Sequence, residues 1–250
     1  MKSFFIEFGL ATRFSGRFFR ELFSLPFEFK EFLRQAYFIG NKSVGVVIFT
    51  GLVIGVILVL QSRPALIEFG AGSYLPSMSA LSVIREVGPL ICSLICAGKF
   101  SSSFCAEIGS MRVTEQIDAM EVSGNNPFKF LVVTRVIALT LMLPALVVIA
   151  DITALMGAFV GANINGEISF NLFFIQVIEK LEFSDLFPSM IKCFFFGWAI
   201  GIIGCFKGFY ATSGTAGVGR ATNSAVVIAL VSVIFIDMIA VQLTNLIFNG

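Results

Sequence analysis

Long, nearly uninterrupted runs of apolar residues recur along the chain, separated by short polar stretches. The clearest run spans Ser43 to Ser62 and contains no charged residue. Because a helix needs about 20 mostly apolar residues to cross a bilayer, this run predicts a membrane-spanning helix. Four further runs contain only one to three charges each: residues 80–106, 128–163, 186–212 and 221–248. The pattern therefore predicts five spans, and its continuity differs from the alternation typical of a membrane β-barrel.

The composition narrows the class of protein. Hydrophobic residues make up 57% of the 250-residue chain and charged residues 13%, whereas a soluble domain carries about 25% charged residues. The net charge of +1 offers no general attraction to nucleic acid. The chain lacks histidine, which excludes a histidine-based catalytic centre or metal site within it. Its five cysteines lack the spacing of a zinc site, and no phosphate-binding GxxxxGK motif is present. We therefore expect neither a metal nor a cofactor in this chain.

The basic residues are distributed unevenly about the predicted spans. Residues 1–42, 99–135 and 207–220 hold 13 of the 17 Lys and Arg residues, and all three segments fall on one side of a five-span arrangement. Cytoplasmic segments of membrane proteins carry an excess of Lys and Arg. The N-terminus is therefore expected in the cytoplasm and the C-terminus on the outer side of the membrane.

The first 40 residues place arginines and phenylalanines on opposite helix faces. Arg13, Arg17 and Arg20 share one face by their spacing, and the opposite arc is apolar: Phe14, Phe18, Phe19, Leu22 and Phe23. Such a helix lies in the membrane interface with its arginines toward lipid headgroups. We expect residues 1–40 to form a cytoplasmic-side interfacial helix and residues 41–250 to form the five-span domain. A partner-binding helix is the less favoured alternative, because a span follows directly.

Charged residues inside the predicted spans are costly in lipid and are usually paired or functional. Arg85 and Glu86 precede Gly88-Pro89, where the second span is expected to kink. Lys192 and Asp237 lie in the fourth and fifth spans, and if the helices pack together Lys192 is able to pair with Glu86 or Asp237. Two interpretations stay open for these charges. They are either pairs that fix how the helices pack or the polar lining of a substrate cavity.

Three further features of the spans have structural interpretations. Asp151, in the third span, is expected near the outer membrane interface rather than in a buried position. The stretch 208–220 is rich in glycine and is expected to be a flexible turn. Small residues at helix spacing allow helices to approach closely, and four such pairs occur: Gly51/Gly55, Gly157/Gly161, Gly197/Gly201 and Gly204/Gly208.

The stretch between the second and third spans is polar and carries helix signals. Thr114 is a candidate N-cap, Glu115 and Asp118 follow near the positive end of the helix, and Gly124 suits its end. A short helix is therefore expected here, with Glu115, Asp118 and Glu121 on one arc. It is either a solvated connection or a docking helix that transmits force from a cytoplasmic partner.

Several longer motifs stand out in addition. They are Arg85-Glu86-Val87-Gly88-Pro89, Ala97-Gly98-Lys99, the string AEIGSMRVTEQIDAM over residues 106–120, Thr134-Arg135-Val136, residues 212–222 and the region around Asp237. Over about residues 40–248 the chain resembles the MlaE-type permease family. These proteins are the membrane subunits of Mla (maintenance of lipid asymmetry) and related MCE-associated ABC transporters.

The resemblance implies a homodimeric permease in the inner membrane of a Gram-negative bacterium, with phospholipid as the substrate. A dimer of ABC ATPases, which binds ATP and Mg²⁺, would dock on the cytoplasmic side. A ring of MCE-domain lipid carriers would sit on the periplasmic side, and a STAS-domain regulator would act through the ATPase. The chain itself would be a transporter subunit and not an enzyme.

The resemblance also implies roles for individual residues. Arg85, Glu86, Lys192 and Asp237 would lie in or near the lipid cavity. A coupling helix at about residues 107–124 would contact the ATPase through Glu107, Met111, Arg112, Thr114, Glu115, Gln116, Asp118 and Glu121. The fold implied is all-α: an N-terminal interfacial amphipathic helix, five transmembrane helices and this coupling helix between spans two and three.

Two functions of other classes remain as alternatives. A stand-alone secondary transporter would use Asp237, Glu86 and Lys192 as an ion relay, although five spans without a visible repeat do not favour it. An intramembrane enzyme would use a serine among residues 101–103 with Lys99, although serines in spans more often pack helices.

Overall fold

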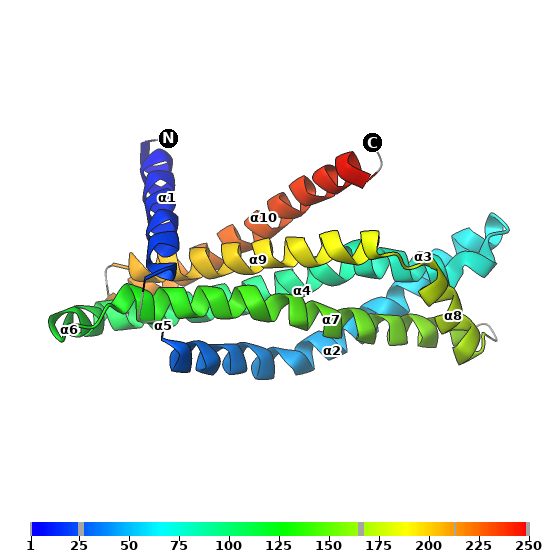
Figure 1. Ribbon diagram of the computed structural model, residues 1–250, viewed down its shortest axis with the longest axis horizontal. Helices are drawn as coiled ribbons and strands as arrows, with labels where there is room; N and C mark the ends of the chain where they lie inside the picture. The colour runs from blue at the N-terminus through cyan, green and yellow to red at the C-terminus, as the bar shows by residue number, and fades with distance from the viewer. Residues whose placement is uncertain (1, 25–27, 165–167, 213, 249–250) are drawn as a thin grey trace. The chain divides into compact units, whose positions relative to one another are not determined.

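A computed structural model describes residues 2–24, 28–164, 168–212 and 214–248 of the chain (Figure 1). Within these residues every regular element is helical. The α-helices are α1 (Lys2–Leu22), α2 (Phe29–Glu68), α3 (Leu75–Ser82), α4 (Gly88–Cys96), α5 (Ser102–Val113), α6 (Gln116–Val122), α7 (Thr134–Asn163), α8 (Phe170–Lys180), α9 (Phe183–Phe209) and α10 (Gly214–Phe248). A short 3₁₀ turn, η1 (Gly72–Tyr74), and three π-helical turns, η2 (Val83–Val87), η3 (Ala97–Ser101) and η4 (Phe128–Val133), join some of them.

Five stretches in the described part of the chain are long and apolar enough to cross a membrane. They are Phe29–Glu68, Gly72–Val113, Phe128–Asn163, Phe183–Phe209 and Gly214–Leu246. The predicted all-α membrane fold with five spans is therefore confirmed. The third stretch has the bounds expected from the sequence, whereas the first and second extend well beyond their apolar runs because polar residues continue the helices at their ends.

Two helix boundaries differ from the sequence expectation. Helix α2 begins at Phe29, so residues 29–40 form the first turns of the first long helix instead of belonging to the N-terminal helix. The polar residues there bond within the helix, since Gln35 donates a hydrogen bond of 2.7 Å to Glu31. Helix α10 begins at Gly214, whose φ of +68° suits glycine, so residues 214–220 are helical and not a flexible turn.

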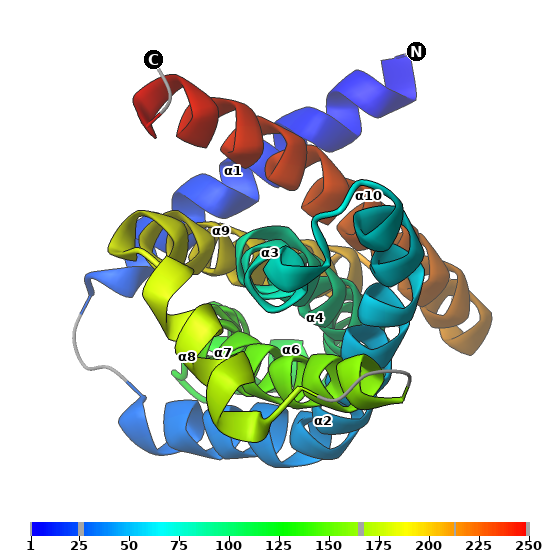
Figure 2. The ribbon, with the colours of Figure 1, turned by 90° about the vertical axis from the view of Figure 1, so that its right-hand side faces the viewer.

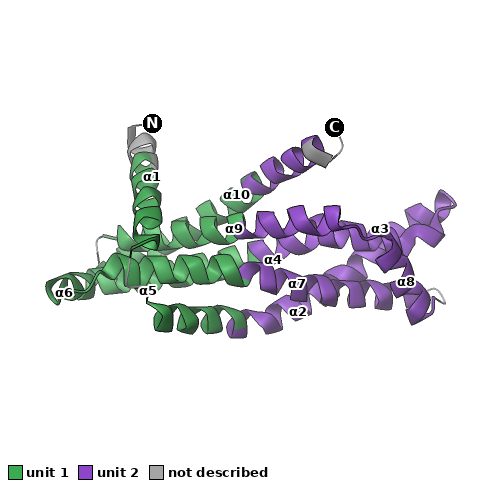
Figure 3. Cartoon of the chain, viewed as in Figure 1, with its two compact units in different colours: residues 1–40, 94–142, 195–235 green, residues 41–93, 143–194, 236–250 purple. Residues whose placement is uncertain are grey.

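The chain divides into two compact units, coloured in Figure 3. One consists of residues 1–40, 94–142 and 195–235, and the other of residues 41–93, 143–194 and 236–250. Several long helices, α7 and α9 among them, contribute residues to both units. The first will be called the α6 unit and the second the α8 unit, after a helix that each contains.

In the α8 unit, α2 and α7 approach each other through glycines. A Cβ atom on Gly55 would lie 1.9 Å from the Ala154 carbonyl oxygen, and one on Gly157 would lie 2.1 Å from the Leu52 carbonyl oxygen. Only glycine permits such backbone contact. The predicted close packing is confirmed for this helix pair.

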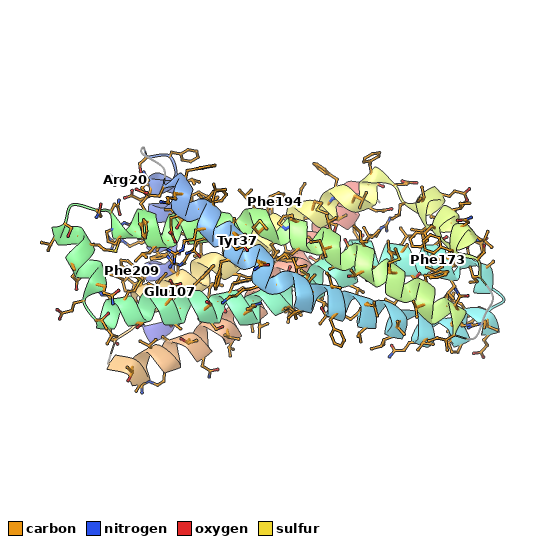
Figure 4. The ribbon with its side chains drawn as sticks, turned by 90° about the horizontal axis from the view of Figure 1, so that it is seen from below. Arg20, Tyr37, Glu107, Phe173, Phe194 and Phe209 are labelled. Carbon is orange, nitrogen blue, oxygen red and sulfur yellow. The ribbon has the colours of Figure 1, made fainter. Side chains whose placement is uncertain are left out.

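Helices α3 and α8, in front in Figure 2, close one apolar cluster of the α8 unit. Phe173 of α8, labelled in Figure 4, is fully buried there with Leu75 of α3 and Val59 of α2. Ser77 adds a hydrogen bond of 3.1 Å to the Gln176 carbonyl oxygen. Helix α8 was not predicted, because its 11 residues are too few for a span.

In the α6 unit, the amphipathic helix α1 is anchored by Phe14, which is only 3% exposed. Its ring contacts the rings of Phe128, Phe206, Phe209 and Tyr210 at centroid distances of 4.9–6.2 Å. The other predicted glycine pairs also meet a neighbouring helix here: Gly197 and Gly201 face Thr140 and Val136 of α7, while Gly204 and Gly208 face Ser101 and Cys105.

Candidate functional site

The π-helical turn η2 sets the positions of Arg85 and Glu86 in the second span. Pro89 has no N–H group, and the turn before it widens so that the Gly88 N–H bonds to the Val83 carbonyl oxygen, five residues back. Such single-turn widenings are frequent at functional sites. The sequence predicted a kink at Gly88-Pro89, and the structure shows a π-helical turn directly before these residues, with both charged residues within it.

Lys192 of α9 joins two carboxylates from different helices. Its Nζ lies 2.9 Å from Oε2 of Glu86 and 3.0 Å from Oδ1 of Asp237. The Lys192 and Asp237 side chains are 6% and 9% exposed, whereas that of Glu86 is 40% exposed. The structure therefore brings together three of the four charged residues selected from the sequence. Of these three, only Glu86 has a substantially exposed side chain.

The fourth residue, Arg85, binds a different partner. Its Nε donates a hydrogen bond of 2.6 Å to Asp185 Oδ1, and a second nitrogen of the guanidinium contacts the same oxygen. Asp185 is almost fully buried and also accepts a 3.1 Å hydrogen bond from the Glu182 backbone N–H, while the Arg85 side chain is 60% exposed. Nearby, Ser189 donates to the Ile84 carbonyl oxygen over 2.8 Å and fixes α9 against η2. These bonds fix the position of the Arg85 guanidinium while leaving much of the side chain exposed.

These groups border one cavity in the α8 unit with a volume of about 370 Å³. It is lined by η2, by the first half of α9 and by the last turns of α10. The lining residues are Arg85, Glu86, Glu182, Ser184, Asp185, Pro188, Ser189, Lys192, Ala240, Val241, Thr244 and Asn245. Five of these residues are charged, four are other polar residues and three are apolar, so the cavity is mainly polar, and convergent polar groups of this kind fix the orientation of a bound small molecule. This cavity is the candidate substrate site.

Asp151 differs from the sequence expectation of an interfacial position. Its side chain is buried, and Oδ1 has no hydrogen-bond partner among the described residues. The carboxyl fills the space beside Gly88, where a Cβ atom would lie 1.8 Å from Oδ1. The sequence around Asp151 is apolar and does not show which residue of another helix packs against it. The contact with Gly88 was therefore not predicted.

The predicted coupling segment contains a sharp break between two helices of the α6 unit. Helix α5 ends at Val113, Glu115 has a left-handed φ of 60°, and α6 begins at Gln116. The N-cap position is therefore Glu115 and not Thr114, whose hydroxyl instead donates 2.9 Å back to the Ser110 carbonyl oxygen.

Helix α6 has one anchored face and one exposed face. Ile117 is fully buried, whereas Glu115, Gln116, Asp118 and Glu121 are exposed and Met111 is half-buried. Arg112 bonds to Asp118 at 2.5 Å and spans the break. Gly124, with a φ of +79°, ends the helix as expected. The helix is held by its apolar side and presents its acidic side.

Glu107 is bound within the protein. Its Oε1 lies 2.9 Å from a guanidinium nitrogen of Arg135, whose side chain is 2% exposed and which also donates 2.8 Å to the Leu131 carbonyl oxygen. Glu107, labelled in Figure 4, is itself half exposed. Sequence reasoning assigned Glu107 to the coupling set and missed this partner, because 28 residues separate the two positions.

The three arginines expected on the basic face of α1 are on the protein surface. Arg13, Arg17 and Arg20 are exposed, and the Arg17 guanidinium lies 4.3 Å from the centre of the Phe128 ring. On the serine run, Ser102 donates 2.8 Å to the Gly98 carbonyl oxygen, one turn back in its own helix. Such back-bonding is typical of helix serines in a packing role.

Comparison with known proteins gives consistent similarities. The family model "Permease MlaE" matches residues 32–243. A probable ABC transporter permease protein of Rickettsia prowazekii is 35% identical over 235 residues, which cover 94% of this chain and 91% of that protein. One of Synechocystis is 35% identical over 201 residues, covering 80% and 76%. The chloroplastic protein TRIGALACTOSYLDIACYLGLYCEROL 1 of Arabidopsis thaliana is 33% identical over 218 residues, covering 87% and 61%.

Proposed function

The chain belongs to the MlaE permease family, and from this premise we propose that it is the membrane subunit of an ABC transporter that moves phospholipid. The transport would run between the inner membrane and a periplasmic MCE-domain lipid carrier. A separate ATPase would supply the energy by binding ATP and Mg²⁺, because the nucleotide-binding motif is absent from this chain.

The cavity around Arg85 and Glu86 is the observation that carries this proposal. A phospholipid needs apolar surface for its acyl chains and a few polar groups for its headgroup. The α8 unit offers both, since charged side chains border a cavity of about 370 Å³ in helices that are otherwise apolar. Intramembrane charges that line a cavity usually mark a substrate path.

The geometry of helix α6 supports the proposal that an ATPase docks on it. The acidic residues of α6 are exposed while Ile117 holds the helix to the rest of the α6 unit. A push on α6 would therefore be carried into α5, the last helix of the second span. The helix is joined to that span through the Glu115 break and the Arg112–Asp118 pair. Rigid-body rearrangement of packed helices would then change the cavity.

The remaining assignments follow the family and the charge distribution. The excess of basic residues in segments 1–42, 99–135 and 207–220 supports a cytoplasmic N-terminus and a periplasmic C-terminus in the inner membrane. The exposed Arg13, Arg17 and Arg20 of α1 would contact lipid headgroups. The complex would contain two copies of this chain, an ATPase dimer and an MCE-domain ring, with a STAS-domain protein as regulator.

A charge reversal on α6 tests the proposal. We expect Glu115→Lys and Asp118→Lys to leave the protein in the membrane at its usual level while the ATPase no longer co-purifies and phospholipid transport falls at least tenfold. Glu179→Lys is the matched control, because Glu179 is an exposed carboxylate on α8, outside the cavity. Normal ATPase recovery and normal transport in both α6 variants would refute the docking role.

A further inference from the structure

The cavity of the α8 unit contains more negative than positive charge. Among the described residues that line it, the cations are Arg85 and Lys192, and the carboxylates are Glu86, Glu182 and Asp185. Asp237 adds a fourth carboxylate through its bond to Lys192. With all groups ionised, the formal excess is two negative charges.

Both cations are already bonded to carboxylates. Lys192 is 6% exposed and holds Glu86 and Asp237, so it is shielded from a ligand. Arg85 binds Asp185 with two of its nitrogens but is 60% exposed. A guanidinium has five N–H donors, so Arg85 retains donors for one anionic group. The cavity therefore offers one cationic contact for a phosphate.

Two carboxylates keep free acceptor positions at the same cavity. Glu86 uses Oε2 for Lys192 and is 40% exposed. Glu182 is exposed, and among the described residues its carboxylate accepts only the hydroxyl of Ser184, at 3.1 Å. A carboxylate accepts about four hydrogen bonds, so both retain capacity for a cationic donor.

We propose that this cavity selects zwitterionic phospholipids, which carry an ammonium group beside the phosphate, over anionic ones. The proposal rests on the phospholipid transport proposed above. The phosphate binds Arg85, and the ammonium binds Glu86 and Glu182. A cavity of about 370 Å³ lies near the lower end of the roughly 300–1,000 Å³ of small-molecule sites, a size that suits a headgroup while the acyl chains extend outside it.

Charge explains the selectivity. An anionic headgroup carries a phosphate and neutral hydroxyls, so it gains at Arg85 but leaves the excess carboxylate charge uncompensated. An ammonium group cancels part of that charge at short range, where attraction between unit charges is strong even in a partly wet site. We expect about a tenfold preference for the zwitterionic lipid, which corresponds to about 1.4 kcal/mol.

The test is a competition for the purified full-length protein. Phosphatidylethanolamine and phosphatidylglycerol with identical acyl chains are offered at equal concentration in mixed detergent micelles, and the bound lipid is counted by native mass spectrometry. Wild type is expected to bind mostly phosphatidylethanolamine. Glu182→Gln should reduce the preference several-fold, and Glu182→Lys should bring it to unity or reverse it. Glu182 is exposed, so these variants are expected to fold.

Glu179→Gln is the matched control. It removes one exposed carboxylate from α8 without touching the cavity, and its lipid preference should equal that of wild type. Equal binding of both lipids by wild type, or an equal effect of the Glu179 and Glu182 variants, would overturn the selectivity while leaving phospholipid binding intact. Failure of wild type to retain either phospholipid would instead count against the proposed function itself.

Discussion

Replacing Lys192 by methionine removes the cation that Glu86 and Asp237 share. Methionine has similar length and no charge, so the change tests charge more than volume. Asp237, 9% exposed and 3.0 Å from the Lys192 Nζ, would be left as a buried carboxylate without its partner. Breaking a buried ion pair by removing one member costs about 3–5 kcal/mol.

The expected loss is large enough to measure as thermal stability. For a chain of this length, about 2–4 °C of melting temperature corresponds to each kcal/mol, so Lys192→Met should melt roughly 6–20 °C lower. The assay is thermal unfolding of the purified protein in detergent. Lys180→Met is the control, because Lys180 is exposed at the end of α8. This variant should have the melting temperature of wild type.

A triple variant separates charge from packing. Adding Asp237→Asn and Glu86→Gln to Lys192→Met removes the unpaired charges, and replacing all members of a buried charge cluster by neutral groups is often tolerated. We expect the triple variant to recover most of the lost stability. The bridging role of Lys192 is refuted if Lys192→Met has the same melting temperature as Lys180→Met. It is also refuted if the triple variant has a lower melting temperature than Lys192→Met.

Two further predictions concern packing. Gly157→Ala should destabilise the protein by about 1–3 kcal/mol, because the new Cβ would lie 2.1 Å from the Leu52 carbonyl oxygen. Gly45→Ala is the control, since a Cβ atom there has no neighbour within 4 Å. Equal melting temperatures of the two variants would contradict the close approach of α2 and α7. Phe14→Ala should loosen α1, since truncating a buried phenylalanine costs about 3–5 kcal/mol, and hydrogen exchange along α1 should speed up. Phe23→Ala, at an 84% exposed position, should leave exchange unchanged, and equal exchange in both variants would show that Phe14 does not anchor α1.

The spans were predictable because bilayer thickness and apolar length are local properties of the sequence. Residues 128–163 illustrate this, since only three charged residues interrupt the apolar run across the whole helical stretch. The close approach of α2 and α7 was also visible, because glycines four apart are a local signal of helix packing. Helix ends were less predictable. The start of α2 contains charged residues, unlike the apolar run that follows, and the Glu31–Gln35 hydrogen bond helps to keep it helical.

The pairings of the site residues depended on contacts between distant positions. Lys192 and Glu86 lie 106 residues apart and Arg85 and Asp185 lie 100 apart, so the sequence marked the charges but left their partners open. The burial of Asp151 beside Gly88 has the same origin. Glu115 in a left-handed conformation was unexpected because glycine usually occupies such positions.

Gentle affinity purification of this chain from its native membrane, with mass spectrometry of the recovered proteins and lipids, tests the central claim most directly. A permease subunit of a lipid-moving ABC transporter should bring with it an ABC ATPase, an MCE-domain protein and bound phospholipid. Recovery of the chain alone in several detergents, together with substrate movement driven by an ion gradient, would contradict that account and favour a secondary transporter.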